Sequence, residues 1–267
     1  MNVFRLFMGI LIVLLGIMLL LNTFGILTVN AWQLFWPLAL VLFGVWMLFK
    51  PAFLRKGGSG IENIDLPLES AVAMRLKLKH GAGRLNLEAA PAGSAAALSG
   101  TFVGGVDYDS YMHGSEKKVT LRTPSDAFWD FIPTAGHEGL SWDVKINRDV
   151  PLALDINSGA SESNLDLSSL NLKELEISTG ASSTQVILPA SAGYTHMKVG
   201  SGAASVKIRV PEGVAGRFYI RHGMAGINVD GMRFPFTGNC YETPGFDACP
   251  NRVEAEIETG VGSVEIH

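Results

Sequence analysis

The sequence predicts a mainly β protein: a two-helix transmembrane hairpin followed by a β-solenoid or rolled β-sandwich of strand–glycine turn–strand repeats. Two long apolar runs near the amino terminus predict the hairpin. A glycine motif that recurs every 21 or 22 residues predicts the repeats. We expect the hairpin over residues 1–50, a linker over 51–61 and a repeat-built β domain over 62–267, and a further division near residue 150 stays open.

Composition separates the chain into a membrane part and an acidic part. Hydrophobic residues make up 48% of the 267 residues and charged residues only 17%, which is low for a wholly soluble protein. No acidic residue precedes Glu62, and the charged residues before it are Arg5, Lys50, Arg55 and Lys56. The remainder therefore holds 17 basic against 25 acidic residues, a formal charge of −8. This balance argues against nucleic acid as a partner.

The apolar runs cover residues 6–21 and 31–49, each close to the ~20 helical residues that span a bilayer. A cleavable signal peptide is the weaker alternative, because the first run is long and no small-x-small cleavage site follows it. The connecting loop has no Lys or Arg, whereas basic residues flank the hairpin on both sides. The positive-inside rule then predicts a multi-pass protein with both termini in the cytoplasm. Neither run contains an ionisable residue, which argues against a transporter or channel.

The repeat motif begins at residues 157, 178 and 200, and looser copies begin at 79, 221 and 258. Around the motifs apolar and polar residues alternate, as in Leu175, Glu176 and Ile177, which is typical of half-buried strands. We expect each glycine to form a tight turn with positive φ, and stacked units to share a core. An uncapped edge would allow a homo-oligomer. The expected structural turn glycines are Gly81, Gly159, Gly180, Gly202, Gly223 and Gly260.

Chemical sites are weakly indicated. A phosphate-binding loop is disfavoured because the segment from Gly200 to Lys207 lacks P-loop spacing and leads into a strand. Asp126 and Asp130 lie four residues apart, but no nucleophile or elbow motif accompanies them. We therefore expect no catalytic residues, no cofactor and no enzyme activity. No metal is expected either, because no metal-ligand spacing relates the six histidines His80, His113, His137, His196, His222 and His267.

An aromatic segment, residues 127–133, interrupts the strand pattern and contains Phe128, Trp129 and Phe131. Two interpretations apply. An end cap or flap packed on the core is favoured, and an exposed patch for a partner is the alternative.

The two cysteines, Cys240 and Cys249, bracket a loop within the 37-residue interval between Gly223 and Gly260. In an oxidising compartment they would plausibly close that loop. The predicted topology instead places them in the cytosol, which favours reduced or redox-labile thiols.

An ordered series of motifs resembles the LiaF-like membrane proteins. After the apolar hairpin come Trp142, the Val-Pro-Leu of residues 150–152, the Gly-Ala of 159–160, the Leu-Asp-Leu of 165–167 and a second Gly-Ala at 180–181. Such proteins carry a LiaI-LiaF-type transmembrane region and a toast-rack β domain. The resemblance implies a location in the bacterial plasma membrane and a role in envelope-stress signalling, in which the best-known member restrains a membrane histidine kinase.

The leading hypothesis is a membrane-anchored, non-enzymatic regulator or scaffold of the bacterial envelope stress response. Its partners would be the lipid bilayer, a membrane histidine kinase or another envelope-stress protein, and a second copy of itself. The alternative is an outward-facing adhesin-like or envelope structural module.

Overall fold

The computed structural model describes residue 40 and residues 61–124 and 140–267. The chain divides into two units, Met1–Gly57 and Gly58–His267. Apart from Leu40, the predicted hairpin lies outside the described residues, as do residues 51–60 of the predicted linker. Within the described part of the chain, no helix is long and apolar enough to cross a membrane.

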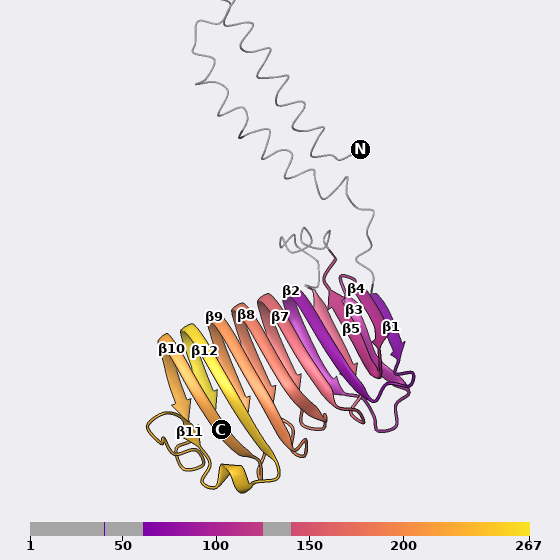
Figure 1. Cartoon of the computed structure of the whole chain (residues 1–267). Coiled ribbons are helices and arrows are strands. Elements are labelled where there is room, and N and C mark those ends of the chain that lie inside the picture. Colours follow the sequence, from indigo (N-terminus) through magenta and orange to yellow (C-terminus); the bar gives the residue numbers. More distant parts are fainter. Residues whose placement is uncertain (1–39, 41–60, 125–139) are drawn as a thin grey trace, which may run out of the picture. The chain divides into compact units, whose positions relative to one another are not determined.

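The second unit is built from β-strands, which confirms the mainly β class. Four long strands, β7 to β10, follow one another through short connections, a fifth, β2, precedes them in the stack, and a sixth, β12, returns at the carboxyl terminus (Figure 1). The strands are β1 (Ile61–Pro67), β2 (Ala73–Ala89), β3 (Ala96–Val103), β4 (Asp107–His113), β5 (Glu116–Arg122), β6 (Ser141–Ile146), β7 (Leu152–Asp166), β8 (Leu172–Ile187), β9 (Tyr194–Arg209), β10 (Ala215–Val229), β11 (Tyr241–Glu242) and β12 (Arg252–Ile266). One short 3-10 helix, η2 (Phe246–Ala248), lies between the last two.

Each long strand belongs to two layers. The first half of β2 pairs with β5 and its second half pairs with β6, whereas β7 runs beside both halves. The strands β2, β7, β8, β9, β12 and β10 follow one another in parallel register across the stack. In Figure 1 these strands bend over one after another. We call the layer made by their first halves, with β4, β5 and β11, the first layer. The layer made by their second halves, with β1, β3 and β6, is the second layer.

The repeat unit differs from the expected strand, tight turn and strand. Each long strand runs without interruption through its glycine, and none of the six predicted glycines has a positive φ. The backbone stays extended at the bend, so conformational freedom is not what glycine supplies there. The need for glycine comes from the neighbouring strand.

The six predicted glycines stack directly on one another, and we call them the glycine stack. A Cβ added to Gly159 would lie 2.4 Å from the carbonyl oxygen of Gly81, and one on Gly180 would lie 2.8 Å from that of Gly159. The same contact recurs at 3.2 Å for Gly202 on Gly180. It continues at 2.6 Å for Gly260 on Gly202 and at 2.8 Å for Gly223 on Gly260. Any side chain at these five positions would push adjacent strands apart, whereas Gly81 supplies the first carbonyl of the series.

The order of the stack also explains the long interval before Gly260. The carboxyl-terminal strand β12 does not extend the stack beyond β10 but lies between β9 and β10. The intervening residues 230–250, which we call the terminal cap, cover part of the outer edge of β10 through β11. Spatial order and chain order therefore diverge at this end of the molecule.

The core lies between the two layers. Inward side chains such as Leu76, Leu87 and Ile177 are almost wholly buried, and each contributes about 1.5–3 kcal/mol by leaving water. Near the first end, Trp142 packs edge-on against Phe102 with ring centroids 5.3 Å apart. No unit has a core of its own, so the layers depend on the stack.

Replacing Gly159 by alanine is expected to destabilise the domain by roughly 1–3 kcal/mol, because the new Cβ meets a backbone carbonyl that has no room to move. The measurement is thermal unfolding of the full chain in detergent, followed by circular dichroism. Gly200→Ala is the matched control, since nothing lies within 4 Å of its added Cβ. Equal effects of the two substitutions would contradict the steric account.

Candidate protein-interaction site

An open groove lies at the level of the bends over four adjacent strands. Its volume is about 820 Å³, and Lys79, Arg122, Asn157 and Ser178 are among its lining residues. Arg122 forms an ion pair with Asp109, and Thr123 accepts a hydrogen bond from Gly81 N–H at 3.1 Å. The groove is open, and it suits contact with a surface better than enclosure of a small ligand.

A row of polar side chains lies beneath the bends, one from each long strand. Pairing places Ser158 beside Thr179, then Ser201 and then Thr259, with the buried His80 at one end and the exposed His222 at the other. The four hydroxyl oxygens are buried and have no hydrogen-bond partner among the described residues. Because buried hydroxyls without partners are costly, this row is a place where ordered water is expected.

His80 sits at the first end of that row and is 1% exposed. Its ring lies 4.9 Å from that of Trp142, and neither of its nitrogens has a partner in the described residues. Burial lowers the pKa of His80 to about 4, because a charged imidazole would lose its hydration there. His80 is therefore neutral at physiological pH and acts as a core residue.

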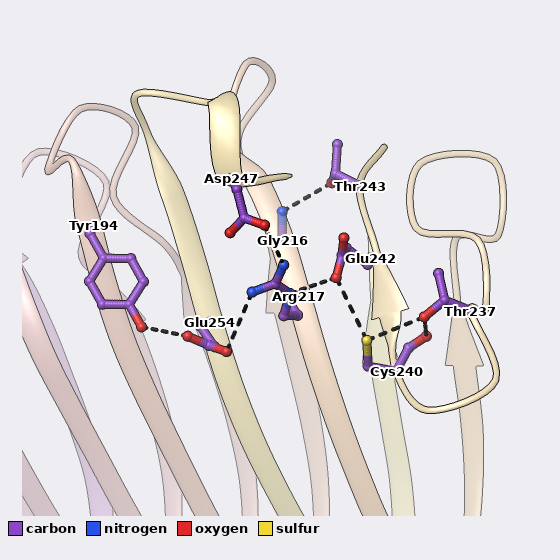
Figure 2. A network of polar contacts seen from close by, with 9 residues as sticks. All are labelled: Tyr194, Gly216, Arg217, Thr237, Cys240, Glu242, Thr243, Asp247 and Glu254. Atoms are coloured by element: carbon purple, nitrogen blue, oxygen red, sulfur yellow. Dashed lines mark hydrogen bonds and ion pairs between the residues drawn. The ribbon is translucent and has the colours of Figure 1, made fainter. Parts of the chain in front are cut away.

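At the other end of the molecule, Arg217 on β10 fastens the terminal cap to the strands (Figure 2). Its Nε donates to Glu242 Oε2 at 2.5 Å and its Nη2 donates to Asp247 Oδ2 at 3.1 Å. A third carboxylate, that of Glu254 on β12, lies 3.7 Å from Nη1. The guanidinium also lies 4.1 Å from the centroid of Phe246. Hydrogen bonding to Glu242 raises the pKa of Arg217 further above its ordinary value, so the charge is permanent.

The network continues on both sides of Arg217. Tyr194 on β9 donates its hydroxyl to Glu254 at 2.5 Å, and this hydrogen bond raises the pKa of Tyr194 to about 12. Thr243 joins the cap to β10 by accepting from Gly216 N–H at 3.0 Å. Figure 2 shows three carboxylates, two from the cap and one from β12, converging on the Arg217 guanidinium. The carboxylates are engaged by Arg217 and Tyr194, and the network fixes the terminal cap against the strands.

The two cysteines both belong to the terminal cap and both are free thiols. Cys240 is buried, and its Sγ lies 3.8 Å from Glu242 Oε2 and 3.4 Å from Thr237 Oγ1. Cys249 donates instead to the carbonyl of Gly245 at 3.6 Å. The thiols therefore engage different partners, and their redox pairing stays a prediction.

Exposed apolar side chains mark the same end of the stack. Met224 is 82% exposed on β10 and Met232 is 97% exposed in the terminal cap. Phe236 in the cap and Val261 on β12 are exposed as well. Exposed apolar side chains are one feature of surfaces that bind protein.

The predicted site residues are placed unevenly. The structure brings all six stack glycines together, whereas Phe128, Trp129 and Phe131 lie outside the described residues, as do Asp126 and Asp130. Sequence reasoning missed Arg217, because its carboxylate partners lie 25 to 37 residues further along the chain. No group of three His, Cys, Asp or Glu side chains in the described residues has the arrangement of a metal site.

Two family models match the chain. The N-terminal domain of toast_rack, DUF2154, matches residues 55–209, and the LiaF transmembrane domain matches residues 7–64. The chain belongs to the toast-rack family. This toast-rack protein therefore has the LiaF-like organisation, a membrane-associated segment followed by a toast-rack β domain, that the sequence motifs predicted.

A solved structure shares the fold of this toast-rack protein. A "putative cell adhesion protein" from Clostridium sporogenes is 19% identical and superposes with a TM-score of 0.69, covering 78% of this chain and 98% of that chain. A "putative adhesin" from Bacteroides fragilis is 7% identical, with a TM-score of 0.31 over 79% of this chain and 99% of that one. No curated protein matches the sequence. At these identities the first likeness concerns the fold alone, and the second carries no argument.

Acidification is expected to destabilise the domain through His80. Its folded pKa of about 4 lies below the unfolded value of 6.5, so the unfolded chain binds the proton more tightly. The contribution is complete above pH 6.5 and is lost as pH falls towards 4, by about 3 kcal/mol in all. Unfolding of the full chain at several pH values measures it. His80→Phe should reduce the dependence of the unfolding free energy on pH, whereas His113→Phe on the exposed strand β4 should leave that dependence unchanged. An unchanged slope in His80→Phe would contradict the assignment.

Removing the charge at position 217 is expected to loosen the terminal cap. In a Cys249→Ser background, Arg217→Met should speed maleimide labelling of the buried Cys240 by about tenfold or more, because two cap carboxylates lose their partner. Arg221→Met is the matched control on the same strand, since the Arg221 side chain is 79% exposed and pairs with Glu258 alone among the described residues. Equal labelling rates in both variants would show that Arg217 does not hold the cap.

Proposed function

We propose that this protein is a membrane-anchored, non-enzymatic regulator or scaffold of the bacterial cell-envelope stress response. The observation that carries the proposal is the order of the two family matches. A LiaF transmembrane domain at residues 7–64 leads directly into a toast-rack domain at 55–209. A membrane segment joined to a folded β domain suits a protein that acts by contact at the membrane surface.

The geometry supports binding rather than turnover. The prominent charged side chain of the far end, Arg217, is engaged by three carboxylates. His80 is a buried neutral ring. The groove over the bends is open, whereas enzymes enclose their substrates in deeper pockets. The β domain thus offers rigid faces and a well-defined end, and protein contact is the use that these features favour.

The proposal includes a topology. Both termini lie in the cytoplasm, the hairpin crosses the plasma membrane twice, and the β domain faces the cytosol. The partner is then a membrane histidine kinase or another envelope-stress protein. The alternative function, an outward-facing adhesin-like or envelope structural module, is favoured by the shared fold with the Clostridium sporogenes protein. The two candidates require opposite locations for the β domain.

Deleting the gene is expected to change the activity of an envelope-stress transcriptional reporter in the source bacterium, because the partner loses its restraint or support. The full chain should restore the wild-type response, whereas residues 1–61 alone should not, since they lack the β domain. A reporter that is unaffected by the deletion, with and without a cell-wall antibiotic, would contradict the regulatory proposal.

A thiol introduced at the most exposed cap position separates the two candidates in the same strain. Met232→Cys, with Cys240→Ala and Cys249→Ser, places one accessible thiol at a site that is 97% exposed. A membrane-impermeant maleimide should label it only in permeabilised cells. Labelling in intact cells would place the domain outside and favour the adhesin-like module.

A further inference from the structure

The second layer ends at a strand with one open side. Residues Met224–Val229 of β10 pair with β12 on one side. On the other side, β11 covers only Arg217 and Phe218, which belong to the first layer. No strand of the described residues pairs with the outer side of Met224–Val229, so the terminal cap closes one layer and leaves the other open.

The backbone on that open side is ready to pair. Asp230 N–H donates to Ile266 O on β12 at 2.9 Å. Because hydrogen-bonding direction alternates along a strand, the groups of Ala225, Ile227 and Val229 point away from β12. These three residues therefore present their N–H and C=O groups along the free edge.

The apolar core is also open at this edge. Ile227 and Val229 pack against the core cluster but are only half-buried. Their counterparts on the interior strand β12, Val264 and Ile266, are at most 1% exposed. One further strand beside β10 would cover these side chains as it pairs with the backbone.

The other layer ends carry features that block strand addition. β1 carries Glu62, Asp65 and Pro67, and β4 carries Asp107 and Asp109. β11 is only two residues long. Charges, proline and short length are the usual protection of exposed edges. Residues 223–229 contain no charged residue and no proline. Among the four layer ends of the described residues, the edge of β10 is therefore the one without features that block strand addition.

We infer that the second half of β10 pairs antiparallel with the same segment of a second copy, forming a two-fold symmetric dimer through a continuous sheet. With the axis at Gly226, Ala225 lies opposite Ile227, and both point their backbone groups across the interface. Met224 lies opposite Asn228. At the ends of the register, His222 lies opposite Asp230, so no like charges meet.

The symmetric arrangement is favoured over addition to another edge of a second copy. β1 of the second layer offers two carboxylates and a proline at its edge, which would lie against the half-buried apolar side chains. Pairing β10 with itself also consumes the open edge in both copies, so assembly stops at two. The inference is independent of the proposed function, because a dimer is compatible with either location of the domain.

A charge-swap pair tests the register. Met224→Lys with Asn228→Lys places lysine opposite lysine at both symmetric contacts. Met224→Glu with Asn228→Lys places opposite charges at the same contacts. Measured by light scattering of the full chain in detergent, the first double variant should weaken the dimer by about tenfold relative to wild type. The second should stay dimeric. Circular dichroism of both confirms the fold.

A cysteine at the axis tests the same geometry by a different readout. Opposed residues that do not hydrogen-bond lie about 4.5 Å apart at Cα, within disulfide range. Gly226→Cys, with Cys240→Ala and Cys249→Ser, should therefore form an intermolecular disulfide on mild oxidation of the full chain. The added Cβ meets only the Gly262 carbonyl oxygen, at 4.0 Å. Asp109→Cys on the protected β4 edge is the control and should not cross-link.

A wild-type chain that is monomeric at all concentrations would overturn the inference. This holds even if the edge of β10 instead pairs with a strand of another protein. Equal cross-linking at Gly226→Cys and Asp109→Cys would also overturn it. So would a dimer that both charge variants leave unchanged, because the copies would then meet elsewhere.

Discussion

The contact between the carbonyl of one glycine and the Cα of the next is the constraint on which the β domain depends. Five such contacts place a hypothetical Cβ between 2.4 and 3.2 Å from a backbone oxygen. Because only glycine permits this approach, six strands bend at the same level. The common bend lets each strand contribute to two layers. Inward side chains then align in rows, and one core forms between layers that no single unit could stabilise.

The interior of such a stack is uniform, so its distinctive features lie at its ends. At the first end, antiparallel strands close both layers and bury Trp142 against Phe102. At the other end, the terminal cap closes the first layer, and Arg217 holds the cap with carboxylates from β11, η2 and β12. The second layer stays open along β10. The ends rather than the repeated faces therefore offer the features that distinguish one partner from another.

The fold could be predicted from the sequence where the signal is local and periodic. The spacing of Gly159, Gly180 and Gly202 predicted stacked units, and alternation along β8 and β9 predicted which side chains lie inside. The predicted tight turn is wrong, because the same glycine motif suits both a sharp turn and an extended bend in contact with a neighbouring strand. Only the neighbouring carbonyl distinguishes the two, and that is a relation between units.

The non-local features were beyond the reach of the sequence. The insertion of β12 between β9 and β10 is a pairing of strands that are distant in the sequence, and the long interval before Gly260 does not by itself predict where β12 lies in the stack. The Arg217 clamp requires three carboxylates that the chain brings together only after β12 has been inserted. The open edge follows in turn, since β10 is the outermost long strand only because β12 is not.

A double-mutant cycle on the glycine stack tests the central claim most directly. Gly159→Ala and Gly180→Ala alter adjacent levels that share a contact, whereas Gly159→Ala and Gly223→Ala alter levels four strands apart. If a change in strand spacing at one glycine alters the spacing at the next, the adjacent pair of substitutions should show a coupling free energy above about 0.5 kcal/mol. The effects of the distant pair should be additive. Additive costs in both pairs would show that each glycine acts alone and would contradict the account.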